Sequence, residues 1–354
     1  MAIRPIARFR TAFSRAWLAV ALLLLACTTA PRAASTLSCT EAASSACYFS
    51  FESAAMEGKL NYFASQAPSA AGAVAAPSTA LVVLHGHPRD AAKSFEAGLR
   101  AARNAGVMGS TLVIAPLFQV DDESARACGS LGVPGARDGD LLWTCTSWIE
   151  GGPARNGQRP TSFAAMDALL ASLVQTWPGL QSITVAGFSA GAQMVQHYIG
   201  FAAEPLRLSA PVRYVVAAPG TWLYFDDMRP QGKPDGCPQF NSWKYGIQNL
   251  PSGLGRGAEQ ARAQYAAADV AYLNGELDSG EGPGAAYRML DKSCSAMAQG
   301  PDRLRRGLAY AEYDRQRLAP DRQRQVVVVP GCAHDVACVL PSPTARAALF
   351  GSAR

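Results

Sequence analysis

Histidine is scarce in this chain, which contains only four histidines among 354 residues, against nine cysteines. A zinc site needs three or four Cys, His or acidic ligands held together, with the cysteines kept reduced. So few histidines argue against a zinc protein. We therefore expect no metal and no other cofactor.

The apolar run near the N-terminus is also short. AWLAVALLLLA, residues 16–26, has about eleven residues, whereas a membrane-spanning helix needs about 20. Such a run after several positive charges is typical of an export signal, and four arginines precede it here: Arg4, Arg8, Arg10 and Arg15. We predict that residues 1–34 comprise a signal peptide and the start of the mature chain, and that the protein is secreted, periplasmic or an outer-membrane lipoprotein.

The processing of this segment has two interpretations. LLAC, which ends at Cys27, resembles a bacterial lipoprotein box, and the following TTAPRAAS offers poor cleavage sites among small residues. Any membrane attachment would then run through a lipid anchor at Cys27. The sequence leaves lipidation and simple cleavage both open.

The mature chain lacks a surplus of positive charge. The formal charge of +5 matches the five arginines of residues 1–34, a stretch without acidic residues, so the remainder is formally neutral. A protein that binds nucleic acid usually carries a basic patch or stripe. We expect no nucleic-acid partner.

The cysteines that follow Cys27 are eight in number. An even number of cysteines in an oxidising compartment indicates disulfide bonds rather than a metal site. Short spacing favours three pairs and leaves a fourth by elimination: Cys39 with Cys47, Cys128 with Cys145, Cys332 with Cys338, and Cys237 with Cys294.

Short apolar runs rich in β-branched residues begin at residue 80, after an N-terminal segment and linker over 35–79. Continuous rather than alternating hydrophobicity predicts strands that are buried on both faces, as in a parallel sheet. Helical patterns separate the runs, so we predict an α/β domain over 80–354. The predicted strands are 80–87, 110–118, 182–189, 212–220, 270–278 and 325–331.

Besides a helix over 190–202, two helices are predicted from periodicity, at 161–178 and around 304–318. The apolar residues of the first, which include Trp177, are expected to pack in the core. The second has a basic face that we expect to be solvated, formed by Arg303, Arg305, Arg306, Arg315 and Arg317. Two long segments, about 119–159 and 221–268, interrupt the pattern and read as insertions after strand ends.

GFSAG, with Gly187, Ser189 and Gly191, matches the pattern G-x-S-x-G. It stands between a predicted strand and a predicted helix, the context in which a sharp turn exposes a nucleophilic serine. Small residues two positions on either side avoid a clash at such a turn. We identify Ser189 as the candidate nucleophile.

A serine hydroxyl needs a base to remove its proton. His85 and His87 lie in the early motif LHGH, and His197 lies within the helix after the serine. His334 alone comes late, in a loop after the last predicted strand, where this architecture places its base. We predict that His334 is the base.

The third member should be an acid between the serine and the histidine in the chain. Asp278 follows the strand that ends in LNGELD and is our choice. Glu276, Asp226 and Asp227 remain alternatives.

The oxyanion hole is expected to use the backbone amides of Ala190 and His87, one after the nucleophile and one after an early strand. His85 is expected to be a buried hydrogen-bonding residue. Three aromatic residues past a strand end are predicted to wall the substrate pocket: Trp222, Tyr224 and Phe225.

LHGHP, GFSAG, GELD and GCAHD occur in an order that resembles the α/β-hydrolase superfamily, over about residues 80–340. Within it, the export signal, the cysteines and GFSAGAQM look like secreted serine esterases and polyhydroxyalkanoate depolymerases. The resemblance implies a mostly parallel central sheet with helices on both faces and a lid-like insertion.

These observations predict an exported serine hydrolase that cleaves a small or polymeric carboxylic ester through an acyl-enzyme. The same triad could serve an amide or peptide hydrolase, and a non-catalytic surface protein on a hydrolase scaffold is a third hypothesis. Cys332 and Cys338 are expected to hold the loop that carries His334.

Overall fold

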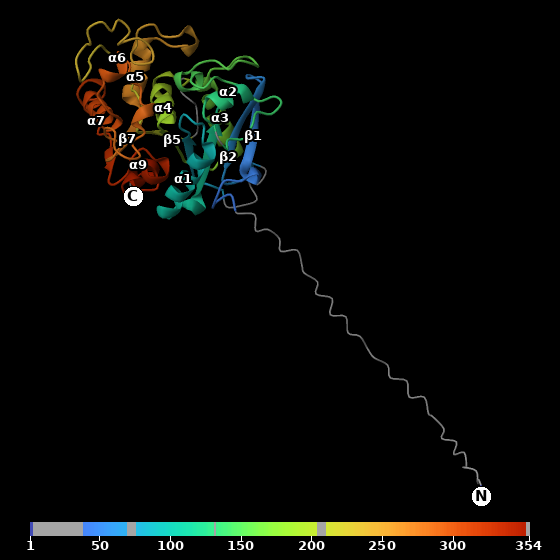
Figure 1. Cartoon of the computed structure of the whole chain (residues 1–354). Coiled ribbons are helices and arrows are strands. Elements are labelled where there is room, and N and C mark those ends of the chain that lie inside the picture. The colour runs from blue at the N-terminus through green and yellow to red at the C-terminus, as the bar shows by residue number, and fades with distance from the viewer. Residues whose placement is uncertain (3–37, 69–75, 131, 204–209, 352–354) are drawn as a thin grey trace. The chain divides into compact units, whose positions relative to one another are not determined.

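The computed structural model describes residues 1–2, 38–68, 76–130, 132–203 and 210–351 (Figure 1). The chain divides into two units, 1–36 and 37–354, and every helix and strand below belongs to the second. The predicted signal segment and Cys27 lie outside the described residues. Within the described ranges, no helix has both the length and the apolarity needed to cross a membrane.

One eight-stranded sheet organises the second unit, in the order β1-β2-β4-β3-β5-β6-β7-β8. Every neighbouring pair from β4 to β8 is parallel, while β1 with β2 and β2 with β4 are antiparallel. The strands are β1 Tyr48–Ser53, β2 Gly58–Ala64, β3 Thr79–Leu84, β4 Thr111–Leu117, β5 Ser182–Phe188, β6 Val212–Ala217, β7 Asp269–Gly275 and β8 Val326–Val329.

Six of these strands coincide with the six predicted runs, and the antiparallel pair β1 and β2 was not predicted. The two strands lie in the stretch that the sequence suggested was an N-terminal segment and linker, so the sheet begins well before residue 80. In β1 the side chains alternate between buried or half-buried and exposed positions. Such a pattern gives a weaker signal than a continuous apolar run.

Helices cover both faces of the sheet, as the continuous hydrophobicity predicted. Alternate residues of one strand serve the two faces: Val82 and Leu84 of β3 pack in one core cluster, and Leu81 and Val83 in another. The first cluster includes residues of α3 Ser162–Thr176, α4 Ala190–Phe201, α5 Ala258–Ala267 and α7 Arg303–Tyr313. The second includes residues of α1 Ala91–Asn104, α8 Val336–Val339 and α9 Arg346–Phe350.

The predicted helices are present, with local signals at their ends. Thr161 caps α3, since its side chain accepts a hydrogen bond from the amide of Ala164 at 3.0 Å. Beyond α7 the chain continues as one turn of π-helix, η7 Asp314–Leu318. Two short helices complete the set: α2 Asp122–Ala127 and α6 Cys294–Met297.

The parallel strands bring their carboxyl ends to one edge of the sheet. Ser189 directly follows β5, Asp278 follows β7 by three residues, and His334 follows β8 by five. The described residues of the two long insertions contain little regular structure: α2 and η4 Ser147–Glu150 in the first, η5 Ser252–Leu254 and α5 in the second.

Candidate active site

Ser189 lies at the turn from β5 into α4 with φ 57° and ψ −121°, a backbone conformation that residues other than glycine rarely adopt. The turn is tightly packed. A Cβ atom on Gly187 would lie 2.2 Å from the carbonyl oxygen of Gly191, and one on Gly191 would lie 2.5 Å from that of His85. Both glycines are therefore needed for the turn that presents Ser189.

His334 reaches Ser189 from the loop after β8. Its Nε2 lies 2.8 Å from Ser189 Oγ, and its ring lies 4.7 Å from that of Phe188, between ring centroids. The amide of His334 donates to the carbonyl of Gly284 at 3.0 Å, and the disulfide Cys332–Cys338 closes the loop around it. Backbone and covalent contacts thus fix the position of the imidazole.

Asp278 lies on the other side of this imidazole, with Oδ2 2.6 Å from His334 Nδ1. A proton on Nδ1 donates to the carboxylate, so Nε2 is left to accept the hydrogen of Ser189 Oγ. The structure therefore brings together the three side chains grouped from the sequence.

The alternative acids point elsewhere. Glu276 Oε2 accepts a hydrogen bond from the amide of Gly331 at 2.8 Å. Asp226 pairs with Arg317 at 3.1 Å, and Asp227 is exposed. None of these contacts involves His334.

Arg303 is a member of the site that the sequence analysis missed. Its Nη1 lies 3.4 Å from Asp278 Oδ1, with 4% and 1% of the two side chains exposed. The expectation that its basic face is solvated was wrong for Arg303 and also for Arg306, which is fully buried. Arg306 uses its guanidinium to bind the carbonyls of Gly300 and Asp291. Helical periodicity marks which residues share a face but does not say what covers it.

Burial lowers the pKa of His334 below its ordinary value, because the interior disfavours the imidazolium. The hydrogen bond to Asp278 raises that pKa, and the charge of Arg303 lowers it. The net shift keeps the imidazole neutral at pH 7, the state in which it can accept a proton.

The amide of Ala190 and the backbone of Gly86 lie beside Ser189. Ala190 is the first residue of α4, so its N–H is one of the donors that the helix itself leaves free. Gly86 is close on the other side: a Cβ atom there would lie 3.8 Å from Ser189 Cβ. The carboxylate of Asp90 accepts the amide of Gly86 at 3.2 Å and steadies the loop that carries His87.

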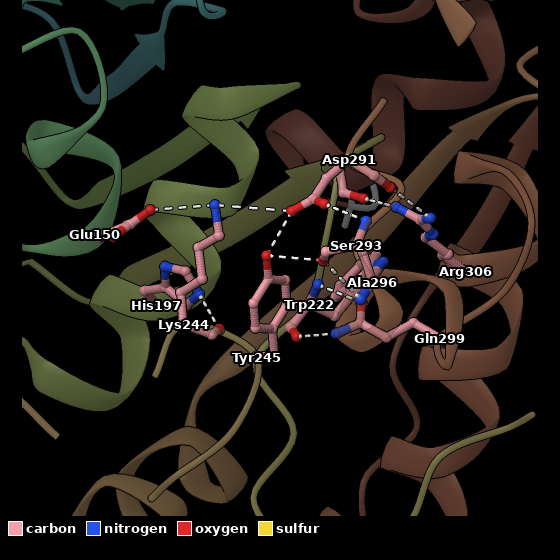
Figure 2. Close-up of polar contacts among 11 residues, drawn as sticks. Glu150, His197, Trp222, Lys244, Tyr245, Asp291, Ser293, Ala296, Gln299 and Arg306 are labelled. Atoms are coloured by element: carbon pink, nitrogen blue, oxygen red, sulfur yellow. Dashed lines mark hydrogen bonds and ion pairs between the residues drawn. The ribbon is translucent and has the colours of Figure 1, made fainter. Parts of the chain in front are cut away.

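A cavity of about 530 Å³ opens over these groups and is lined by Ser189 and His334 themselves. Its volume lies within the range of pockets that hold small organic molecules. Apolar atoms from Pro88, Ile149, Ala190, Ala286 and Met289 line it, together with polar groups that include His87, Glu150, Lys244, Asp291 and Arg303. Figure 2 shows Lys244 between Glu150 and Asp291.

The predicted aromatic wall is absent from this cavity. Trp222, Tyr224 and Phe225 are almost completely buried and do not line it. Trp222 stacks on Tyr310 of α7 at 4.4 Å between ring centroids, and Tyr224 packs against the same tyrosine. Phe225 packs against Tyr265 of α5 at 5.2 Å. The prediction was wrong because an aromatic run past a strand end can face either the core or the pocket. Here the tyrosines of α5 and α7 provide aromatic contacts in the core.

No protein-family model and no curated protein matches the chain. Among solved structures, poly(aspartic acid) hydrolase-1 from Sphingomonas sp. KT-1 is similar with a TM-score of 0.57 at 19% identity, covering 88% of this chain and 98% of that one. A poly(3-hydroxybutyrate) depolymerase from Bordetella parapertussis reaches 0.50 at 19% identity, covering 79% and 80%. At such identities the likeness establishes the fold.

The chain has the α/β-hydrolase fold. In this fold, the eight cysteines from Cys39 onward form four disulfide bonds, the three that short spacing favoured and the fourth left by elimination: Cys39–Cys47, Cys128–Cys145, Cys332–Cys338 and Cys237–Cys294. Across the described residues, no cluster of three or more His, Cys, Asp or Glu could hold a metal ion.

The two fully buried histidines of the fold have structural contacts. Phe118 donates its amide to His85 Nε2 at 3.2 Å, and His85 Nδ1 lies 2.9 Å from the carbonyl of Gly86. His197 lies between the carbonyls of Ile149 and Lys244. Burial lowers the pKa of His85 to about 3 and that of His197 to about 4. Both rings are thus neutral parts of the framework.

Proposed function

We propose that this protein is an exported serine hydrolase that cleaves carboxylic esters, with Ser189, His334 and Asp278 as its triad. One observation supports this most strongly: the unbroken line of hydrogen bonds from Ser189 Oγ through His334 to Asp278, at the floor of a cavity. The two distances and the order serine, imidazole, carboxylate are those that nucleophilic acyl transfer requires.

In this proposal Ser189 Oγ attacks the ester carbonyl while His334 Nε2 takes its proton. The tetrahedral oxyanion is held by the amides of Ala190 and His87, and Asp278 stabilises the imidazolium. His334 then gives the proton to the departing alcohol, which leaves an acyl group on Ser189. A water molecule, deprotonated by the same imidazole, releases the acid and restores the serine.

A panel of p-nitrophenyl esters of increasing acyl length, with the Ser189→Ala variant beside the native enzyme, tests the proposal. We expect hydrolysis that falls by about 10⁴-fold or more in the variant, since the nucleophile is lost. Turnover equal in the two proteins would refute it. No turnover together with no labelling by a fluorophosphonate would favour a non-catalytic protein on this scaffold.

Hydrolysis of an amide is a second candidate, because one of the similar structures is named as a hydrolase of poly(aspartic acid), a polyamide. The leaving group is selected by the pocket and not by the triad. Esters and anilides with the same acyl group separate the two candidates, and we expect the ester to be cleaved faster.

Export is supported by the four disulfide bonds, which persist in oxidising compartments. The intact mass of the mature protein would report the cleavage point, any lipid on Cys27 and the number of oxidised pairs. A full-length mass with reduced cysteines would count against export.

A further inference from the structure

The polar groups of the cavity raise the question of which substrates it accepts. Its ionisable lining residues are His87, Glu150, Lys244, Asp291, Arg303 and His334. A charged group on a substrate loses hydration when it enters a cavity of this kind, and binds well only where an opposite charge is available to it. The state of each lining charge therefore sets the substrate class.

Arg303 is already engaged. It is almost completely buried, its Nη1 lies 3.4 Å from Asp278 Oδ1, and the same nitrogen donates to the carbonyl of Ala285 at 2.8 Å. A substrate carboxylate could bind Arg303 only by competing with the acid of the triad.

Lys244 is also engaged, by two carboxylates. Its Nζ lies 3.2 Å from Glu150 Oε1 and 3.9 Å from Asp291 Oδ2, as Figure 2 shows. Asp291 Oδ2 also accepts a hydrogen bond from the hydroxyl of Tyr245 at 2.6 Å, and its Oδ1 accepts one from the amide of Ser293 at 2.9 Å. The three side chains come from separate segments of the chain and hold one another in place.

The charges around Lys244 balance. Arg306 donates to the backbone carbonyl of Asp291 at 2.9 Å. Burial lowers the pKa of Arg306 and the negative charge of Asp291 raises it, so a second cation besides Lys244 lies close to Asp291. The remaining lining groups, His87 and His334, are neutral at pH 7, because burial lowers the pKa of both. Among the described residues that line the cavity, no charge is left to pair with a charged substrate.

We propose that the cavity selects neutral esters and rejects esters with either charge near the scissile bond, and that the pairing of Lys244 with Glu150 and Asp291 is what excludes anions. This inference rests on the proposed esterase function. It separates the protein from a hydrolase of polyanions, because a chain of carboxylates would meet no available cation in this cavity.

Two pairs of substrates test the selectivity. p-Nitrophenyl hexanoate and the p-nitrophenyl monoester of adipic acid differ in a terminal carboxylate, while 3,3-dimethylbutyl butyrate and butyrylcholine differ in a positive charge at equal shape. We expect kcat/KM to be at least about tenfold higher for the neutral member of each pair, equivalent to about 1.4 kcal/mol. Equal values within either pair would overturn the proposal.

The double variant Glu150→Gln/Asp291→Asn tests the role of Lys244. With both carboxylates removed, the ammonium becomes available, and we expect the ratio of adipate monoester to hexanoate to rise by at least about tenfold. Glu312→Gln is the matched control, because it removes a carboxylate paired with Arg315 outside the cavity, and it should leave the ratio unchanged. A ratio that stays constant in the double variant would overturn the role of Lys244.

Thermal melting checks that the double variant is folded, and Glu150→Gln alone replaces it if it is not, with a smaller rise expected. Failure of the proposed function would look different: no ester of any charge would be cleaved, and a fluorophosphonate would not label Ser189. Cleavage of neutral and charged esters alike would leave the function standing and remove only the selectivity.

Discussion

Two regions of the site are built in different ways: the floor, which is Ser189, Asp278 and His334, and the wall, which is Glu150, Lys244 and Asp291. Ser189, Asp278 and His334 follow strands of one sheet within a few residues, and backbone contacts fix them. Glu150 and Lys244 come from the two long insertions and Asp291 from the segment between β7 and α7, and ion pairs hold these partly exposed side chains. The floor therefore allows one arrangement, whereas the wall can change its charge without moving the floor. In the proposed function, chemistry depends on the first region and substrate selection on the second.

The largest effect is expected from Asp278→Asn on the floor. The amide can no longer hold the imidazole in the tautomer that accepts the serine proton, so kcat should fall by about 10³-fold to 10⁴-fold. Steady-state kinetics with a neutral p-nitrophenyl ester measures this. Glu276→Gln is the matched control, since Glu276 follows the same strand but binds the amide of Gly331. If kcat fell as much in Glu276→Gln as in Asp278→Asn, the loss would come from a change near the end of β7 and not from the contact with His334.

Arg303 connects the two regions, because it lines the cavity and contacts Asp278. The rate should rise with pH as His334 loses its proton, and the midpoint of that rise should lie below 6.5, the ordinary value for histidine, because burial lowers the pKa of His334. Arg303 also lowers this pKa, so Arg303→Gln should move the midpoint of kcat/KM to higher pH.

The same variant should lower kcat/KM by about tenfold, because Asp278 loses the guanidinium that faces it. Arg303→Lys should restore most of the shift in the pH profile, since it retains a positive charge. An unchanged midpoint in Arg303→Gln would mean that the arginine only supports the fold.

The smallest effect is expected at the disulfide beside His334. Cys332 and Cys338 are only six residues apart, so loss of the bond should lower the free energy of unfolding by about 2 kcal/mol at most. Turnover of the folded protein should also fall, by several-fold, because the loop then holds the imidazole less firmly. The variant Cys332→Ser/Cys338→Ser, followed by urea unfolding and ester kinetics, measures both. Unchanged turnover would refute the role of the disulfide.

The floor could be predicted from the sequence because its signals are local. Gly187 and Gly191 mark the sharp turn at Ser189, and chain order with strand ends then points to Asp278 and His334. Short spacings along the chain likewise favoured three of the disulfide pairs and left the fourth by elimination. Each of these rules depends on the spacing or order of residues along the chain, which the sequence gives directly.

The wall could not be predicted, because it depends on which distant segments meet. Nothing local distinguishes Lys244 or Asp291 from a solvated residue, and Arg303 looks like part of an exposed basic face until its partner Asp278 is placed. The prediction that Trp222 lines the pocket was wrong for the same reason, because its neighbour Tyr310 lies far along the chain. The edge strand β1 was missed because a half-buried strand carries a weak pattern, and in β2 the polar Asn61 interrupts the buried apolar run.

The central claim is that Ser189 is a nucleophile activated by His334. Intact mass spectrometry after exposure to a fluorophosphonate tests it most directly, with native protein, Ser189→Ala and His334→Ala compared at equal times. The account predicts one adduct on native protein, none on Ser189→Ala, and labelling slowed by about 10³-fold or more in His334→Ala. An adduct that persists in Ser189→Ala, or native protein that stays unmodified, would contradict it.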